Sequence, residues 1–304
     1  MIGVLVNPNA RGVRRRPGLA NRLRARLGRG GEVIETAGDG EVPAAIDRFL
    51  STGCDPIAIC GGDGTTLSTV TAILSRPDAP PRIALLRGGT VNTVAKNAGI
   101  SGAPEQVLAG LVARLRTHQP LLETPLDTLC VNGRFGFLFA TAMGARFLEA
   151  YYGGPIQGAP WATAMAVRIV ASCVIQGPYA QRLFAPADVS LVADGELLPI
   201  TQVRLLLAST VPDVGIGMRV MWRAGSEPGR FHFLASALST TAMALQMDRV
   251  LTGRPLHGQP HEDRMLASLD IRFPSPTSYT LDGELFRADR IEVRAGPRLR
   301  IVRP

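Results

Sequence analysis

The stretch CGGDGTTLSTV, residues Cys60 to Val70, decides the fold of this chain. An apolar run, Pro56 to Cys60, predicts a buried strand, and a helical pattern, Thr65 to Leu74, follows it. The glycines between them let the backbone approach a ligand closely, and the amides that open a helix are donors to phosphate oxygens. Asp63 stands out, because a carboxylate repels phosphate unless it binds a cation or takes up a proton. Asp63 is therefore the leading functional candidate, with helix capping in a tight turn as the alternative role.

The alternation of strand and helix extends outward from this stretch over residues 1–120, which predicts an α/β domain with a largely parallel sheet. The further strands expected are Ile2 to Val6, Glu32 to Thr36 and Arg82 to Leu86, and the further helices are Leu19 to Leu27, Pro43 to Leu50 and Val94 to Ala98. Three loops rich in glycine or asparagine follow strands: Asn7 to Gly12, Gly61 to Thr65 and Gly88 to Asn92. Ligands of such sheets bind at the carboxyl ends of the strands, so we expect the three loops to form one site.

The pattern changes after Pro120, and residues 121–304 predict a second, mainly antiparallel β domain with one long helix, Trp161 to Ile175. Its expected strands include Thr128 to Val131, Phe135 to Thr141, Val189 to Val192, Val203 to Ala208 and Phe231 to Ala235. We expect a nucleotide cleft between the two domains, and the last segment of the chain to pack back on the first domain. The sequence Asp-Gly-Glu occurs twice, at Asp194 to Glu196 and at Asp282 to Glu284. The first copy is expected to be a hairpin turn with a structural role.

The charge and aromatic content of the chain bear on which partners it is expected to bind. The formal charge of +8 is carried almost entirely by arginine, since Lys96 is the only lysine. Aromatic residues make up 5% of the chain and no nucleic-acid recognition motif accompanies the charge, so nucleic acid is not an expected partner. The arginines around the first loop, from Arg11 to Arg29, predict either attraction to an anionic membrane surface or a solvated helix face.

Several classes of nucleotide-binding and membrane protein are excluded. The sequence contains no GxxxxGK[ST] motif, no GxGxxG in its first strand-to-helix turn, and none of the protein-kinase hallmarks. It has no apolar run long enough to span a bilayer, and its first residues show neither the basic n-region nor the small-residue cleavage site of a signal peptide. Its four cysteines show no CxxC spacing and lie among apolar residues, which favours free core thiols over a disulfide framework. We therefore expect a cytoplasmic protein that associates with membranes only transiently.

Taken together, four motifs resemble the diacylglycerol kinase catalytic family, the soluble bacterial lipid kinases related to sphingosine and ceramide kinases. These motifs are NPNARG from Asn7, GGDGTTLSTV from Gly61, GGTVNTVAKN from Gly88 and YTLDGEL from Tyr279. GGDGT alone also occurs in NAD kinases and phosphofructokinase-like enzymes, so the order of all four motifs carries the resemblance.

The resemblance implies ATP and Mg²⁺ as cofactors and assigns roles to residues at the motif positions. The residues that would hold the nucleotide are Asn7, Thr36, Gly61, Gly62, Asp63, Gly64, Thr65, Thr90 and Asn92. Asp63 would also lie near the nucleotide-borne metal. Asp63, Asp282 and Glu284 would form the catalytic acidic set, with one of the late pair taking the proton from a lipid hydroxyl.

The expected activity is phosphorylation of a membrane-lipid hydroxyl, with diacylglycerol or a related glycerolipid as the expected substrate. The alternatives are a ceramide or sphingoid-base kinase, an NAD-kinase-like enzyme, and a non-catalytic nucleotide- or lipid-binding protein on a kinase scaffold. The chain departs from the family pattern at Arg87, where the family commonly has proline, and at Val91, where it has glycine. Only Glu227 is acidic where many bacterial members hold a structural magnesium. The oligomeric state stays open, a homodimer being one alternative.

Overall fold

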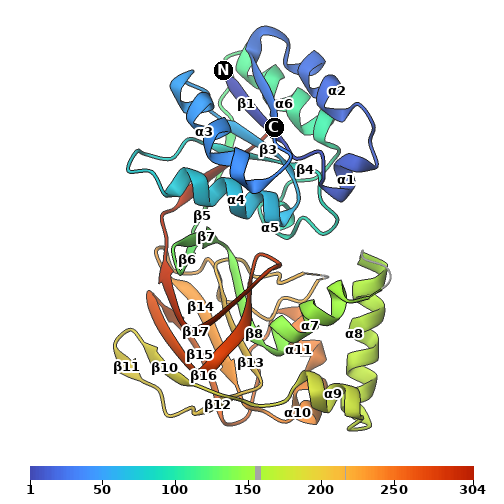
Figure 1. The fold of residues 1–304 in the computed structure, drawn as a ribbon, viewed down its shortest axis with the longest axis vertical. Helices are drawn as coiled ribbons and strands as arrows, with labels where there is room; N and C mark the ends of the chain where they lie inside the picture. The colour runs from blue at the N-terminus through green and yellow to red at the C-terminus, as the bar shows by residue number, and fades with distance from the viewer. Residues whose placement is uncertain (155–158, 216) are drawn as a thin grey trace. The chain divides into compact units, whose positions relative to one another are not determined.

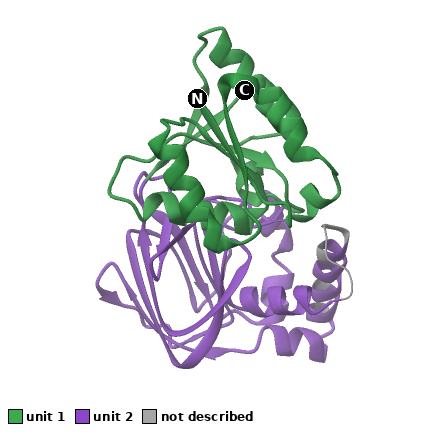
Figure 2. Cartoon of the chain, turned by 45° about the horizontal axis from the view of Figure 1, so that its top comes forward, with its two compact units in different colours: residues 1–126, 298–304 green, residues 127–297 purple. Residues whose placement is uncertain are grey.

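The structure is a computed structural model that describes residues 1–154, 159–215 and 217–304. It divides into two compact units, the first made of Met1–Leu126 and Arg298–Pro304 and the second of Asp127–Pro297. Figure 2 colours the units separately and shows that both chain ends belong to the first one.

A six-stranded sheet in the order β2-β1-β3-β4-β18-β5 forms the centre of the described part of the first unit. Its strands are β1 Ile2–Val6, β2 Gly31–Glu35, β3 Ile57–Gly61, β4 Ile83–Arg87, β5 Leu122–Leu126 and β18 Leu299–Arg303. Strands β1 to β4 are parallel, with Val6 level with Cys60 and Gly61 level with Arg87. Their carboxyl ends therefore lie at one edge, and the predicted α/β fold with a largely parallel sheet is confirmed.

Helices cover both faces of this sheet. They are α1 Arg11–Arg14, α2 Leu19–Leu27, α3 Val42–Ser51, α4 Asp63–Leu74, α5 Thr93–Asn97 and α6 Pro104–Arg116. Helix α2 packs with α6, and α3 packs with α4 on the opposite face (Figure 1). Helix α6 was not predicted from the sequence, although proline opens it and buried apolar residues recur along one side.

The arginines of α2 lie on its solvent face. Leu19, Leu23 and Leu27 recur at a spacing of four and are buried, whereas the arginines between them are exposed. Arg22 pairs with Glu105 at 3.0 Å and Arg24 pairs with Glu35 at 2.8 Å. Part of the predicted basic cluster is thus a solvated, ion-paired helix face.

The last strand of the chain belongs to the first sheet. Strand β18 runs parallel to β4, with Ile301 level with Ile83, and antiparallel to β5, with Leu299 level with Leu126. The chain therefore leaves the first unit after β5 and returns to it at Arg298.

An antiparallel sheet dominates the second unit, with the main strand order β15-β14-β13-β8-β16-β17-β6-β7 and with β10 also pairing β16 and β11. Its strands are β6 Leu129–Val131, β7 Arg134–Gly136, β8 Leu138–Ala142, β10 Ser190–Ala193, β11 Glu196–Leu197, β13 Leu205–Ser209, β14 Phe231–Ser236, β15 His261–Leu266, β16 Ser268–Leu281 and β17 Glu284–Ala295. Strands β9 Ala187–Asp188 and β12 Gln202–Val203 pair in a separate two-stranded sheet. The predicted antiparallel β class is confirmed. The single strand predicted from Phe135 to Thr141 is interrupted, because β7 ends at Gly136 and β8 begins at Leu138.

The described part of the second unit holds the predicted long helix and four shorter helices that were not predicted from the sequence. The long helix is present as α8, Ala159–Val174, but α7 Met143–Tyr152, α9 Pro178–Leu183, α10 Thr240–Ala244 and α11 Met247–Thr252 accompany it. Figure 1 shows these helices gathered on one side of the sheet. Their apolar residues join one buried cluster with Leu205, Leu207 and Leu234 of the sheet, so long-range burial stabilises helices too short to be stable alone.

No helix among the described residues has the length and hydropathy needed to span a membrane. All four cysteines are free, and Cys54, Cys60 and Cys173 are buried.

Candidate functional site

Three loops of the first unit meet at the carboxyl edge of its parallel sheet. The amide of Asn7 donates to the carbonyl of Cys60 at 3.0 Å, and the amide of Gly88 donates to the carbonyl of Gly61 at 2.9 Å. The loops after β1, β3 and β4 are therefore joined through their backbones. This is the convergence that the loop positions in the sequence predict.

Glycine is required where these loops touch. A Cβ atom on Gly89 would overlap the Cα atom of Gly62, and one on Gly12 would overlap the carbonyl oxygen of Gly88. A Cβ on Gly88 would lie 2.9 Å from the amide nitrogen of Gly61, closer than real Cβ contacts allow. The backbones thus pack directly on one another, and their amides lie close together at the strand ends.

Side chains of the first two loops, those of the predicted binding residues Asn7 and Thr65 among them, hold the loops in this arrangement. The Nδ2 of Asn7 donates to the buried Oγ1 of Thr65 at 2.9 Å, while its Oδ1 accepts from the amide of Asn9 at 2.8 Å. The hydroxyl of Thr66 donates to the carbonyl of Gly62 at 3.1 Å. The hydrogen bonds of Asn7 and Thr66 therefore fix the start of α4.

Asn92 shapes the third loop. It adopts a left-handed backbone, with φ of 53°, and its side chain is buried. Its Oδ1 accepts from the amide of Gly89 at 2.9 Å and its Nδ2 donates to the carbonyl of the same residue at 3.0 Å. Asparagine tolerates this conformation better than most residues, so its place in the motif has a local structural cause.

Asp63 is the first residue of α4, yet its carboxylate is directed to a different helix. Its Oδ1 accepts from the amide of Val94, in the first turn of α5, at 3.4 Å. Burial raises the pKa of Asp63 above its usual range, although the Thr93 and Val94 amides and the charge of Lys96 act in the opposite direction. The alternative of a simple cap on its own helix does not describe these contacts, because Asp63 links the second and third loops.

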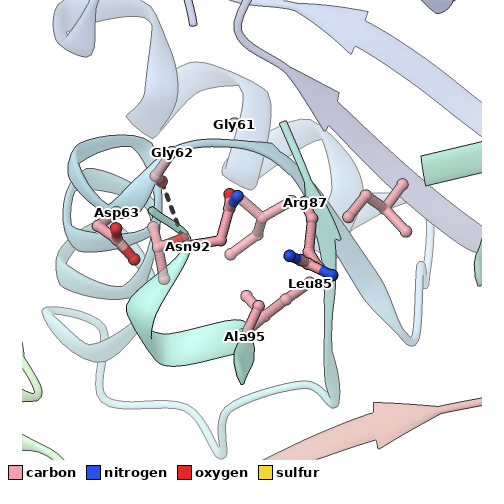
Figure 3. A pocket seen from close by; sticks show the side chains of 10 residues that line it. Gly61, Gly62, Asp63, Leu85, Arg87, Asn92 and Ala95 are labelled. Atoms are coloured by element: carbon pink, nitrogen blue, oxygen red, sulfur yellow. Dashed lines mark hydrogen bonds between the residues drawn. The ribbon is translucent and has the colours of Figure 1, made fainter. Parts of the chain in front are cut away.

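A pocket lies between these loops and the sheet (Figure 3). It is lined by Ile59, Gly61, Gly62, Asp63, Thr66, Leu85, Leu86, Arg87, Asn92 and Ala95. Asp63 is the only carboxylate in that lining and Arg87 its only cation. Arg87 was not among the predicted site residues, and its place at the end of a strand, beside a glycine loop, is the sequence signal that could have found it.

Three further residues predicted to bind the nucleotide, Thr36, Thr90 and Gly64, lie at other points of the first unit. Thr36 is buried at the end of β2, where its amide donates to the carbonyl of Val6 at 2.9 Å. Thr90 is exposed on the third loop, and Gly64 lies in the first turn of α4.

Cys60 precedes the second loop, but burial raises the pKa of its thiol to about 12, so it stays protonated and is a poor nucleophile.

In the second unit, Asp282 opens the two-residue turn between β16 and β17. Asp282 and Gly283 have φ of 49° and 89°, and Leu281 pairs with Glu284, as in hairpins with Asp-Gly turns. The buried carboxylate of Asp282 accepts from the amide of Phe137 at 3.0 and 3.2 Å and from that of Leu138 at 2.9 Å. Asp282 therefore holds the break between β7 and β8.

The first Asp-Gly-Glu turn repeats this arrangement and confirms the hairpin predicted for it. Asp194 has φ of 46°, and its Oδ1 accepts from the amides of Ala267 and Ser268 at 3.0 and 2.7 Å. Burial raises the pKa of Asp194, but these amides and Arg230 outweigh it and bring the pKa below its ordinary value. The aspartates of both turns thus share one structural function.

Glu284 differs from Asp282 in being exposed. The neighbouring carbonyl of Gly283 accepts from the hydroxyl of Tyr152, at the end of α7, at 2.9 Å. Of the two late acidic residues, Glu284 is the one whose side chain reaches solvent.

No cluster of three or more potential metal ligands occurs within residues 1–154, 159–215 and 217–304. In the segment where Glu227 stands, that side chain approaches Arg230 at 3.7 Å.

Parts of the sequence and the fold of the chain are similar to those of known proteins. Residues 1–122 match the family model of the diacylglycerol kinase catalytic domain. A "Probable lipid kinase YegS-like" protein of Stenotrophomonas maltophilia (strain K279a) is 33% identical over 90 residues, and the matched segment covers 29% of this chain and 29% of that protein.

Solved structures extend the likeness in fold to the whole chain. A diacylglycerol kinase from Bacillus anthracis str. Sterne aligns over 100% of this chain and 96% of its own, with a TM-score of 0.68 and 14% identity. A second structure from the same organism gives a TM-score of 0.73 at 14% identity, again over 100% and 96%. At this identity the alignments establish the fold. The similarity to the diacylglycerol kinase catalytic domain thus covers residues 1–122, and over the whole chain the similarity is one of fold.

Proposed function

We propose that the protein is a lipid kinase that transfers a phosphoryl group from ATP to a hydroxyl of a membrane lipid, with diacylglycerol as the substrate. The observation that carries this proposal is the direct packing of Gly62 against Gly89 beside Asp63, in a domain that matches the diacylglycerol kinase catalytic model. Packed glycine loops at the carboxyl ends of parallel strands supply backbone donors for phosphate oxygens.

The same loops are suited to a nucleotide that carries Mg²⁺. This ion usually binds one or two carboxylates, several waters and substrate phosphates, and Asp63 offers one carboxylate in the pocket lining. Because burial raises the pKa of Asp63, a neighbouring cation would stabilise its charged form. Asp63 would therefore hold the ion, which when bound neutralises charge on the transferred phosphoryl group.

Glu284 is the proposed base for the lipid hydroxyl. An alcohol is a weak nucleophile near neutral pH, so a carboxylate within hydrogen-bond reach aids its deprotonation. The oxygens of Asp282 already accept backbone amides, whereas the Glu284 side chain is exposed. We therefore propose that Glu284 accepts the proton of the lipid hydroxyl and that Asp282 positions the turn.

The substrate class rests on the relatives. The matching family model is described by diacylglycerol kinase, and the curated relative is described as a lipid kinase. Both descriptions favour a lipid over NAD as the acceptor. Ceramide and sphingoid bases remain alternatives within the lipid class, and each offers a hydroxyl to the same chemistry.

A substrate panel tests the proposal. The purified protein is incubated with Mg²⁺ and ATP labelled in the γ-phosphoryl group, and with diacylglycerol, monoacylglycerol, ceramide, a sphingoid base or NAD. We expect the label in the diacylglycerol reaction to appear in a phosphorylated lipid. Label in ceramide or sphingoid base alone would correct the substrate, label in NAD would replace the proposal, and label in none would contradict kinase activity on these substrates.

A further inference from the structure

Arg87 is a cation at the base of the glycine loops. It ends β4, level with Gly61 of β3, and lines the pocket together with Gly61, Asp63 and Asn92. Figure 3 shows its side chain extending from β4 beside Leu85 and Ala95. The residue is half-buried, and its Nε is buried without a hydrogen-bond partner among the described residues.

Within the described part of the chain, the surroundings of Arg87 offer its buried Nε no acceptor. A guanidinium is always protonated and has only donors, so a buried N–H without an acceptor is unfavourable. Asp63 lines the same pocket, yet among the described residues the buried Nε of Arg87 has no hydrogen-bond partner, Asp63 included. The carboxylate of Asp63 instead accepts from the amide of Val94.

Asp63 is the only anionic side chain among the loop residues that line the pocket with Arg87. Gly61 and Gly62 line the pocket, and both polar atoms of the Asn92 side chain are bonded to the backbone of Gly89. Because the Asp63 carboxylate accepts from the amide of Val94, an anionic ligand rich in oxygen would supply the acceptor that Arg87 lacks. A phosphate group fits, because the planar guanidinium can donate two parallel hydrogen bonds to it.

We propose that Arg87 binds a phosphate of the nucleotide and so adds a side-chain cation to the backbone donors of the glycine loops. This inference rests on the proposed function, because it takes the ligand of the pocket to be ATP. It predicts that the affinity for ATP depends on Arg87 through the phosphates rather than through the nucleoside.

Titration calorimetry with ATP and with adenosine tests this role in three variants. Arg87→Gln removes the cation, Arg87→Lys keeps the charge but loses the planar pair of donors, and Arg29→Gln is the matched control. Arg29 is exposed in the turn before β2, at the opposite end of the parallel strands.

We expect Arg87→Gln to weaken ATP binding by about 10- to 100-fold, the usual range for a hydrogen bond to a charged group. Arg87→Lys should lose less, adenosine binding should change little, and Arg29→Gln should bind ATP as the wild type does. Equal ATP affinity in Arg87→Gln and Arg29→Gln would overturn the proposal, as would an equal loss for ATP and adenosine.

If Arg87→Gln does not fold, the increase in melting temperature caused by tripolyphosphate decides the question in Arg87→Lys. A smaller increase than in the wild type supports the role, and an equal one overturns it. The role of Arg87 and the proposed kinase activity can fail independently of each other in these experiments. Arg87-dependent ATP binding without label in any lipid would leave this inference standing and contradict the kinase, whereas lipid labelling with Arg87-independent ATP binding would do the reverse.

Discussion

The side-chain amide of Asn7 donates a hydrogen bond to the hydroxyl of Thr65 at 2.9 Å, across 58 positions of sequence. This bond fastens the loop after β1 to the first turn of α4, where Asp63 begins the helix. Asn7 and Thr65 are both expected to contact the nucleotide, and they are also hydrogen-bonded to each other. The shape of the loops depends on that bond.

Removing either partner should therefore destabilise the first unit. Asn7→Ala and Thr65→Val each remove one side of the bond, and we expect each to lower the free energy of unfolding by about 1–2 kcal/mol. The double variant should lose less than the sum of the two, because the bond is lost only once. Chemical denaturation of the four proteins measures this coupling, and strictly additive losses would show that the bond contributes nothing.

The packing of Gly89 on Gly62 gives a second prediction. Gly89→Ala places a methyl group on the neighbouring backbone, and we expect a loss of roughly 1–3 kcal/mol in unfolding free energy together with weaker ATP binding. Gly38→Ala is the matched control, since nothing lies within 4 Å of a Cβ atom there. Wild-type ATP affinity in a folded Gly89→Ala protein would contradict direct contact between loops as a requirement of the site.

Asp63 predicts a dependence of stability on pH. Because burial raises its pKa in the folded protein, the unfolded chain loses this proton first as the pH rises above about 4. The folded state is then progressively destabilised until its own raised pKa is passed. Asp63→Asn removes this titration, so the melting temperature of the wild type should fall relative to that of Asp63→Asn as the pH rises from about 4 toward the raised pKa. A difference that does not change with pH would contradict the raised pKa.

The sequence predicted the first unit better than the second, for a physical reason. Strands such as β3, expected at Pro56–Cys60 and found at Ile57–Gly61, are short apolar runs bounded by glycine loops, and these signals are local. Helices α9 and α10 are short, and residues such as Leu183 and Met243 become buried only through contacts distant in sequence. No local signal specifies those contacts.

The site shows the same contrast. The three glycine loops could be predicted to converge because parallel strands place their carboxyl ends together. That Asp282 fixes Phe137 could not be predicted, because the two residues are 145 positions apart. The proposed roles, Asp282 as the residue that positions the turn and Glu284 as the base, depend on that contact. The sequence alone therefore left both residues as candidates for the base.

The two Asp-Gly-Glu turns provide a matched test of this division. Asp282→Ala leaves the amides of Phe137 and Leu138 without acceptors and should cost roughly 2–4 kcal/mol of unfolding free energy. Asp194→Ala should also be destabilising, but less so, since Asp194 is more exposed. Glu284→Gln should change stability by less than about 0.5 kcal/mol. Thermal and chemical unfolding measure all three, and a large loss of stability in Glu284→Gln would argue against its assignment as the base.

The most direct test of the account is the transfer of the γ-phosphoryl label of ATP to diacylglycerol by the wild type, Asp63→Asn, Glu284→Gln and Glu196→Gln. Glu196 has the same place in the first turn as Glu284 has in the second, and it pairs with Arg264 at 2.9 Å, so Glu196→Gln controls for the change itself. We predict label in the lipid with the wild type and Glu196→Gln, and losses of about 10²- to 10⁴-fold with folded Asp63→Asn and Glu284→Gln. Full transfer by either of these two variants, or equal losses in Glu284→Gln and Glu196→Gln, would contradict the account.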